Sequence, residues 1–242
     1  MKSFAGSKTS CCVYAAIIAA GLAAPAAQAS FVVPFEANNK GAITSFTGVG
    51  GVINQSNVTV GTFDISIYDA TSNSGTSRTP QISTVSVSIA KKGSSKKTDI
   101  LAINLWDTGF LPIGSPLTLA GSGSVTFNAA TSGDSATFAS GADPLDGTYS
   151  LTTPSPPVQT GSSTATYSSG GFPQTQTLVE QTAVFSPNGT NPFSMGNNLE
   201  LSLAGGSNVT LSYTTTVPET ASLELLAVGG LGLLLKRRRK GQ

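Results

Sequence analysis

Residues 199–213 run LELSLAGGSNVTLSY, and this stretch decides the fold class. Apolar residues alternate with polar ones on both sides of the glycine pair Gly205-Gly206. An alternation with a period of two gives a β-strand one buried and one solvated face. Glycine supplies the positive φ angles that a tight turn requires. We therefore predict strands over residues 199–204 and 208–213, joined as a hairpin.

The same alternation continues through the middle of the chain. Apolar positions of this kind are Phe63, Ile65, Ile67, Val85, Val87 and Ile89. A second hairpin is predicted between residues 82–90 and 100–106, across the basic loop of residues 91–97. No window from Ser30 to Val217 has the 3.6-residue apolar stripe of an amphipathic helix. Short strands separated by Gly, Pro and Asn are typical of a β-sandwich, so we predict an all-β ectodomain over residues 30–216.

Residues 153–171 differ in composition from their surroundings. Three prolines are followed by a run rich in Gly, Ser and Thr. Such a segment is either a flexible connection or a long loop within the sandwich. The sequence leaves both interpretations open.

Charge is scarce and unevenly placed. Only 10% of the 242 residues are charged. Residues 1–29 and 218–242 hold 7 of the 13 bases and 2 of the 12 acids, so the middle has 6 bases, 10 acids and a net charge of −4. A nucleic-acid partner therefore has no electrostatic support.

The N-terminus, residues 1–29, has the pattern of a cleavable export signal. Lys2 and Lys8 are followed by an apolar run over residues 11–24, and Ala27-Gln28-Ala29 offers the small residues that signal peptidase accepts. Cleavage there makes Ser30 the new N-terminus. The only two cysteines, Cys11 and Cys12, lie inside this signal, so we expect a mature protein without disulfides.

The C-terminus, residues 217–242, has the pattern of a second targeting signal. Val217-Pro218-Glu219-Thr220 precedes an apolar run over residues 221–235, and a basic cluster follows: Lys236, Arg237, Arg238, Arg239 and Lys240. Fifteen helical residues span about 22 Å, which is short of a hydrocarbon core of about 30 Å. The terminal bases favour a cytoplasmic end, which would orient the ectodomain outward. We predict a short transmembrane helix that holds the protein until processing; an ordinary membrane anchor is the alternative.

This tail resembles that of the PEP-CTERM family, which combines a Val-Pro-Glu-Pro type motif, one hydrophobic helix and a terminal Arg-rich cluster. The resemblance covers about the last 25 residues, with Thr220 in place of the second proline and Glu224 inside the apolar run. It implies recognition by an exosortase, a membrane-embedded sorting enzyme of bacteria that make exopolysaccharide. On this resemblance, Pro218 and Glu219 belong to a substrate motif and to no active site.

Side chains for catalysis are few. The chain has no histidine, which excludes histidine-based triads and histidine-ligated zinc. Nearby acid pairs are Asp64 with Asp69, Asp99 with Asp107, and Asp143 with Asp146. They permit a carboxylate glycosidase only if two of them converge in space, and we interpret them as turn and surface acids. Residues 143–147 could also offer oxygens to Ca²⁺, although their spacing is typical of a turn. We expect no catalytic residue, metal or cofactor.

Two further features concern ligand contact. Trp106 and Tyr68 are placed by strand alternation on the faces opposite their apolar neighbours, where aromatic rings could stack on sugars; a covering loop or sheet is the alternative. The basic loop at residues 91–97 could bind an acidic polysaccharide, although lysines at an exposed loop commonly protect a sheet edge.

The expected function is that of an exported, non-enzymatic bacterial surface or matrix protein. Its expected partners are signal peptidase, an exosortase-like enzyme, the inner membrane before processing, and exopolysaccharide. We expect an inner-membrane-tethered intermediate that passes to the cell surface or extracellular matrix. The alternatives are a carbohydrate-binding or ice-binding module and a glycan hydrolase. Ice binding needs a regular Thr array, and residues 175–177 and 214–216 do not recur with a fixed period.

Overall fold

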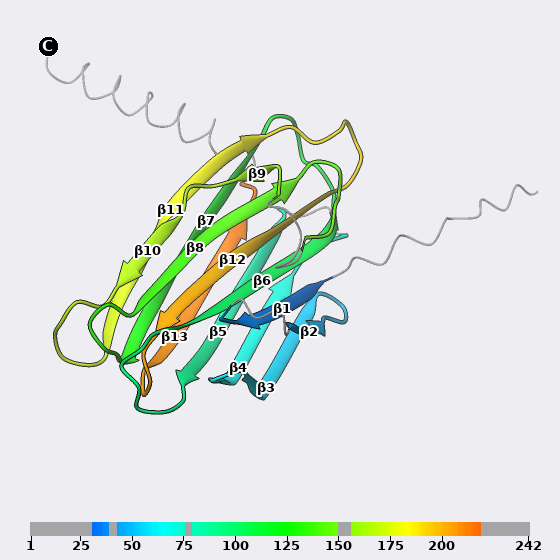
Figure 1. Ribbon diagram of the computed structural model, residues 1–242. Helices are drawn as coiled ribbons and strands as arrows, with labels where there is room; N and C mark the ends of the chain where they lie inside the picture. The colour runs from blue at the N-terminus through cyan, green and yellow to red at the C-terminus, as the bar shows by residue number, and fades with distance from the viewer. Residues whose placement is uncertain (1–30, 39–42, 76–78, 150–155, 219–242) are drawn as a thin grey trace, which may run out of the picture.

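The computed structural model describes residues 31–38, 43–75, 79–149 and 156–218 (Figure 1). These residues form thirteen strands and no helix. The strands are β1 (Val32–Ala37), β2 (Ile43–Thr47), β3 (Val52–Val60), β4 (Phe63–Ser72), β5 (Gln81–Lys91), β6 (Asp99–Phe110), β7 (Leu117–Ala129), β8 (Ser135–Asp143), β9 (Val158–Gln159), β10 (Ser163–Thr166), β11 (Gln174–Phe185), β12 (Phe193–Leu203) and β13 (Asn208–Thr216).

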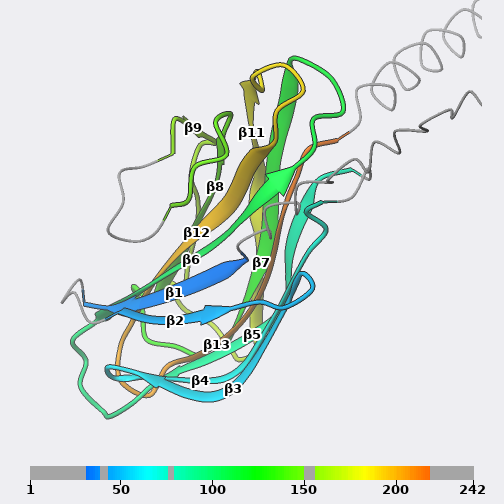
Figure 2. The ribbon, with the colours of Figure 1, turned by 90° about the vertical axis from the view of Figure 1, so that its right-hand side faces the viewer.

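The strands form two antiparallel sheets that pack face to face (Figure 2). One sheet has the order β10-β8-β12-β6-β1-β2, with β9 beside β8, and the other has the order β11-β7-β13-β5-β4-β3. The predicted all-β sandwich is confirmed. The predicted signal helix and transmembrane helix lie outside the described residues, among which no helix is long and apolar enough to cross a membrane.

Eight of the strands follow the jelly-roll order. From β5 to β13 the chain forms nested antiparallel pairs, in which β5 lies beside β13, β6 beside β12, β7 beside β11, and β8 beside β10. Alternate pairs fall into opposite sheets, as in a long hairpin rolled up on itself. Strands β4 and β3 extend one sheet, and β1 and β2 extend the other.

Both predicted hairpins are wrong. Strands β12 and β13 lie in different sheets, and so do β5 and β6, so each short connection crosses from one sheet to the other. The glycine turn itself is present, with the amide of Ser207 donating to the carbonyl of Ala204 at 3.2 Å. Alternation and turn residues determine which face of a strand is buried and where the chain reverses. They do not determine which strand becomes the partner.

Bulges change the predicted burial on two strands. Val85 is 64% exposed while Thr84 and Val87 are buried, because β5 has an extra residue here relative to both neighbours. Strand β4 has a similar irregularity between Ile65 and Ile67. One additional residue moves every following side chain to the opposite face, which turns Tyr68 into the core.

Residues 156–171 belong to the sandwich and do not link separate units. Strands β9 and β10 both pair with β8. The described part of the proline-rich stretch therefore agrees with the interpretation as a long loop within the sandwich. Residues 150–155 lie outside the described residues.

The sandwich has two ends with different connections. The lysine end comprises residues 92–98, 130–134, 167–173 and 204–207. The exit end comprises residues 48–51, 73–75, 79–80, 111–116, 144–149 and 186–192. The described chain begins and stops at the exit end, because Gly48 donates its amide to Phe31 and Val217 donates its amide to Pro80.

Candidate functional site

Trp106 is buried on the outer side of its sheet. It is 1% exposed, and its indole lies over two glycines of neighbouring strands, Gly196 on β12 and Gly141 on β8. A Cβ atom at Gly196 would come within 2.2 Å of Cε3 of the indole, so a glycine is needed beneath the ring. The indole Nε1 donates to the carbonyl of Gly147 at 3.0 Å, and the ring of Tyr149 lies 4.9 Å away between centroids.

Tyr68 is buried in the opposite sheet. Its side chain is 0% exposed, and its hydroxyl lies 3.3 Å from the hydroxyl of Tyr213 in the core. Burial raises the pKa of Tyr213 to about 12 and raises the pKa of Tyr68 well above its usual value. Neither ring is open to a glycan in this structure: a loop covers Trp106, which is the alternative that the sequence left open, and a bulge turns Tyr68 into the core.

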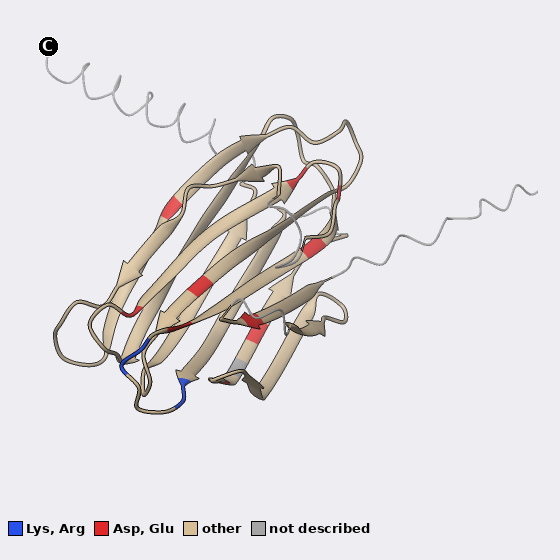
Figure 3. Ribbon diagram, in the orientation of Figure 1, with Lys and Arg blue, Asp and Glu red and all other residues tan. Residues whose placement is uncertain are grey.

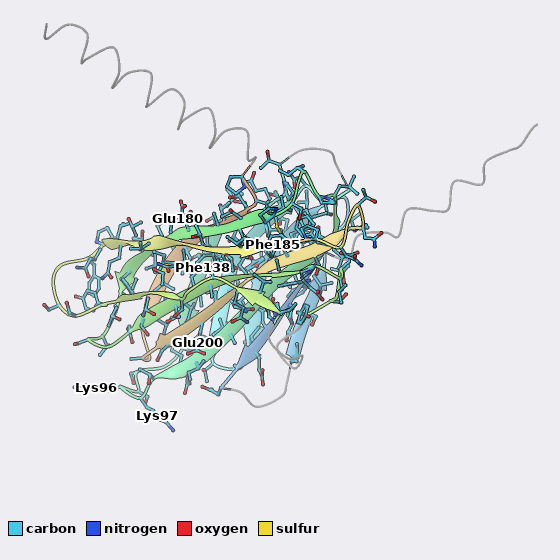
Figure 4. All side chains as sticks on the ribbon, turned by 90° about the horizontal axis from the view of Figure 1, so that it is seen from above. Lys96, Lys97, Phe138, Glu180, Phe185 and Glu200 are labelled. Atoms are coloured by element: carbon cyan, nitrogen blue, oxygen red, sulfur yellow. The ribbon has the colours of Figure 1, made fainter. Side chains whose placement is uncertain are left out.

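The lysine end concentrates the described positive charge (Figure 3). Lys91 is buried and forms a 2.8 Å ion pair with Asp99, and Lys92 forms another with Asp64. Hydrogen bonds from these lysines lower the pKa of both carboxyls. Lys96 and Lys97 extend away from the sandwich and are exposed (Figure 4). Two of the four lysines are therefore neutralised, which leaves a small cationic tip.

The carboxyl oxygens of residues 143–147 are used within the fold. Asp143 accepts from the amides of Leu145 at 2.9 Å and Gly147 at 3.0 Å, and from the hydroxyl of Tyr149 at 3.0 Å. Asp146 accepts from the amide of Gly109 at 2.8 Å. These bonds support the turn interpretation over Ca²⁺ ligation, and the described residues contain no acidic group of three suited to a metal.

One of the predicted acid pairs, Asp99 with Asp107, is held far apart. Asp99 and Asp107 lie eight residues apart on β6, a separation of about 26 Å. Asp107 is 0% exposed at the exit end, with one carboxyl oxygen that has no hydrogen-bond partner. Burial raises its pKa, and the nearby charge of Asp146 adds to the effect. A carboxyl closed off from solvent cannot protonate a glycosidic oxygen in this conformation.

The exit end has a shallow depression of about 310 Å³. It lies between the connection that follows β8 and the connection between β11 and β12. Its lining residues are Pro144, Leu145, Asp146, Asn188, Asn191 and Pro192. The amides and the carboxyl could hydrogen-bond a polar ligand, but no aromatic ring lines the depression.

The outer side of the β11-β7-β13-β5 strands carries many hydroxyl groups, and we call it the hydroxyl face; Val85, Val179, Glu180 and Val184 are exposed among them. Hydroxyl groups on neighbouring strands form hydrogen bonds with one another. The oxygen–oxygen distances are 2.9 Å for Ser83 with Thr214, 3.1 Å for Ser124 with Ser212, and 2.9 Å for Thr126 with Thr175. Strands β7, β13 and β5 contain no charged residue except Lys91, which is buried. Sequence analysis missed this face, because its regularity arises across strands and not along any one of them.

The predicted sorting motif begins inside the folded domain. Val217 is 0% exposed, and its amide donates to the carbonyl of Pro80 at 3.0 Å. It follows β13, which lies between β7 and β5 in the sheet. Pro218 is half-buried, and Glu219, Thr220 and the basic cluster at residues 236–240 lie outside the described residues. The same holds for Ala27, Ala29 and Ser30 of the predicted signal cleavage site.

Comparison with known proteins adds little to this description. No protein-family model matches the chain, and no curated protein matches it. One similar solved structure comes from work on the specificity of carbohydrate-binding modules of the β-sandwich superfamily. It is 13% identical, the match covers 76% of this chain and 82% of that chain, and the TM-score is 0.30. A likeness of this size carries no argument about the function of this chain.

Proposed function

We propose that this protein is an exported, non-enzymatic surface or matrix protein that is sorted through its C-terminal tail. The observation that carries the proposal is the position of Val217, which is both the last buried residue among those the structure describes and the first residue of the sorting-type motif. Phe31, which is 2% exposed, directly follows the predicted new N-terminus at Ser30. The folded domain therefore fits between the two predicted processing sites, and removal of both segments would leave its core intact.

Substitutions in the motif test this function. The variant Pro218→Ala/Glu219→Ala alters the motif but keeps Val217 in the core. In a host that encodes an exosortase, it should accumulate in the inner-membrane fraction with its tail, whereas the unaltered protein should reach the surface or medium without it. The matched control is Asn191→Ala/Pro192→Ala at the same end of the sandwich, which should be sorted normally. Normal sorting of the motif variant would contradict the proposal.

A second candidate function is contact with a neutral polysaccharide through the hydroxyl face. Its support is the absence of charged outer side chains on β7, β13 and β5 among the described residues, together with rows of hydroxyl groups. Hydroxyls and uncharged sugars exchange hydrogen bonds with little desolvation cost compared with charged groups. Such contacts are individually weak, so a polymer that spans many of them is the suitable ligand.

Affinity electrophoresis in gels that contain neutral or acidic polysaccharides separates these alternatives. A lysine placed on the hydroxyl face in Thr210→Lys should abolish retardation by a neutral polymer. Thr164→Lys, on the outer side of the other sheet, adds the same charge and should leave retardation unchanged. Retardation only by acidic polymers, lost in Lys96→Ser/Lys97→Ser, would assign binding to the lysine end instead.

A further inference from the structure

Four of the eight exposed large apolar side chains among the described residues lie at the exit end, and three others, Val85, Val179 and Val184, lie on the outer side of β5 and β11. Val49 is 86% exposed, Val52 51%, Leu111 41% and Leu145 75%. Val49, Leu111 and Leu145 lie in three different connections at this end. Val52 is the first residue of β3 and lies beside one of these connections. At the lysine end, the one large apolar side chain of comparable exposure in the described residues is Phe172, whose ring stacks on Tyr167. The two ends therefore differ in their affinity for an apolar surface.

The chain also leaves the fold at the exit end, with little length to spare. Only Pro218, Glu219 and Thr220 separate the buried Val217 from the apolar run at residues 221–235. Three extended residues cover at most about 10 Å. If the apolar run lies in the bilayer, as the proposed function requires, the five steps from Thr216, the last residue of β13, to Ala221 keep the end of β13 within about 18 Å of the start of the membrane segment.

The N-terminus imposes the same orientation. Phe31 lies at the exit end, where its carbonyl accepts from the amide of Gly48 at 2.7 Å. Before cleavage, the predicted export signal would therefore leave the fold at the same end as the tail. Both attachments then direct one end of the sandwich toward the lipid.

The distribution of charge also favours the exit end as the part that meets lipid, through an apolar contact and not through lysines. The four described lysines lie at the opposite end, which is separated from the exit end by the length of β7 (Figure 3). Thirteen extended residues span about 44 Å, several times the screening length of about 8 Å at physiological salt. Asp143 and Asp146 lie at the exit end. The contact is therefore apolar and suits a zwitterionic headgroup layer better than an anionic one.

From these observations we propose that the exit end of the sandwich rests on the lipid bilayer while the tail holds the protein, with Val49, Val52, Leu111 and Leu145 in the interface. This inference rests on the proposed function of the tail. Single apolar side chains bind lipid weakly, so the tether is needed to hold them at high effective concentration. Cleavage of the tail removes the tether and releases the sandwich from the surface.

Site-specific fluorescence in vesicles tests this contact. The described residues contain no cysteine, so a fluorophore can be attached to Leu145→Cys or Val49→Cys after replacement of Cys11 and Cys12 by serine. Ser95→Cys at the lysine end is the matched control. The full chain is placed in phosphatidylcholine vesicles that contain a nitroxide-labelled lipid. We expect at least threefold stronger quenching at positions 145 and 49 than at position 95, and none in a chain that ends at Pro218.

The outcomes distinguish a failure of this proposal from a failure of the proposed function of the tail. If the full chain floats with the vesicles but positions 145 and 95 are quenched equally, the tail acts as a membrane segment and the seating of the exit end is wrong. If the full chain does not float with the vesicles, the tail function fails and the seating fails with it. A further variant has Val52→Ser and Leu111→Ser in the Leu145→Cys chain, where weaker quenching is expected; unchanged quenching would contradict the apolar contact.

Discussion

The two ends of the sandwich are closed by different means. At the lysine end, the buried carboxyl of Asp134 accepts from the amides of Thr131 at 2.7 Å and Ala204 at 2.8 Å, and from the hydroxyl of Ser207. It thereby joins connections that lie 70 residues apart. At the exit end, Asp143 bonds mainly within its own loop, and apolar side chains face solvent. One end is closed around a single buried carboxyl that joins distant connections, whereas the other combines separate long-range bonds, such as that from Gly109 to Asp146, with exposed apolar side chains.

The largest expected effect comes from altering this buried carboxyl at the lysine end. Asp134→Asn places an amide NH₂ against donors that now point at a carboxylate oxygen. We expect the free energy of unfolding to fall by about 3 kcal/mol, because hydrogen bonds to a charged group are lost and buried donors stay unpaired. Urea unfolding measures this. Asp146→Asn at the exit end keeps its acceptor oxygen for Gly109 and should cost less than about 1 kcal/mol. Equal losses would contradict the contrast between the ends.

The next effect concerns the covered indole near the exit end. In Gly196→Ala, the new methyl would meet Cε3 of Trp106 at 2.2 Å and the carbonyl oxygen of Leu105 at 2.3 Å. We expect a loss of about 2 kcal/mol from overpacking. Because Trp106 is the single tryptophan of the chain, its fluorescence should shift to longer wavelength as the ring is displaced. Gly133→Ala is unsuitable as a control because of its positive φ, whereas Ser168→Ala, exposed at the lysine end, should change neither quantity.

A smaller effect is the pH dependence that Asp107 confers. Burial raises the pKa of this carboxyl in the folded state, so the native protein retains the proton to a higher pH than the unfolded chain. Stability contributed by this group is therefore lost as pH rises from about 4, the unfolded value, through the folded pKa. Asp107→Asn removes that loss, so its free energy of unfolding relative to the unaltered protein should increase from pH 4 upward and then level off. Urea unfolding at pH 3.5, 5 and 7 would contradict this if the difference were constant.

The smallest effect is expected at the cationic tip. Lys96 and Lys97 are exposed, so Lys96→Ser/Lys97→Ser should change the free energy of unfolding by less than about 0.5 kcal/mol. Vesicle association of the full chain should also be unchanged, because these residues lie at the end away from the proposed lipid contact. Weaker flotation of this variant would indicate a membrane contact at the lysine end and would contradict the proposed contact at the exit end.

Local pattern predicted the class and the buried faces well. Leu199, Leu201 and Leu203 are all buried, as the alternation requires, and so are Val209 and Leu211. Local pattern could not predict which strands pair, because a jelly roll pairs segments that are distant in sequence. A glycine turn suits a crossing between sheets as well as a hairpin within one.

The candidate site depended on the same nonlocal contacts. Strand alternation placed Trp106 on the outer side of its sheet, where it lies, and left open whether a ligand or a covering loop meets the ring. Gly141 and Gly196, which lie 35 and 90 positions later in the chain, make the slot that buries it. Their signal was a glycine inside a strand, which often marks a close approach of another group. The long-range role of Asp134 gave no local signal, because two of its three partners belong to a turn reached only after five further strands.

The central claim is that the sandwich is the product left between two processing sites. Intact mass spectrometry of the protein recovered from the surface or medium of an exosortase-encoding host tests it most directly. We predict a product that begins at Ser30 and ends within residues 217–220, so that Val217 is retained. A product that still contains residues 221–242, or a cut before Val217 that would remove a core residue, would contradict the account.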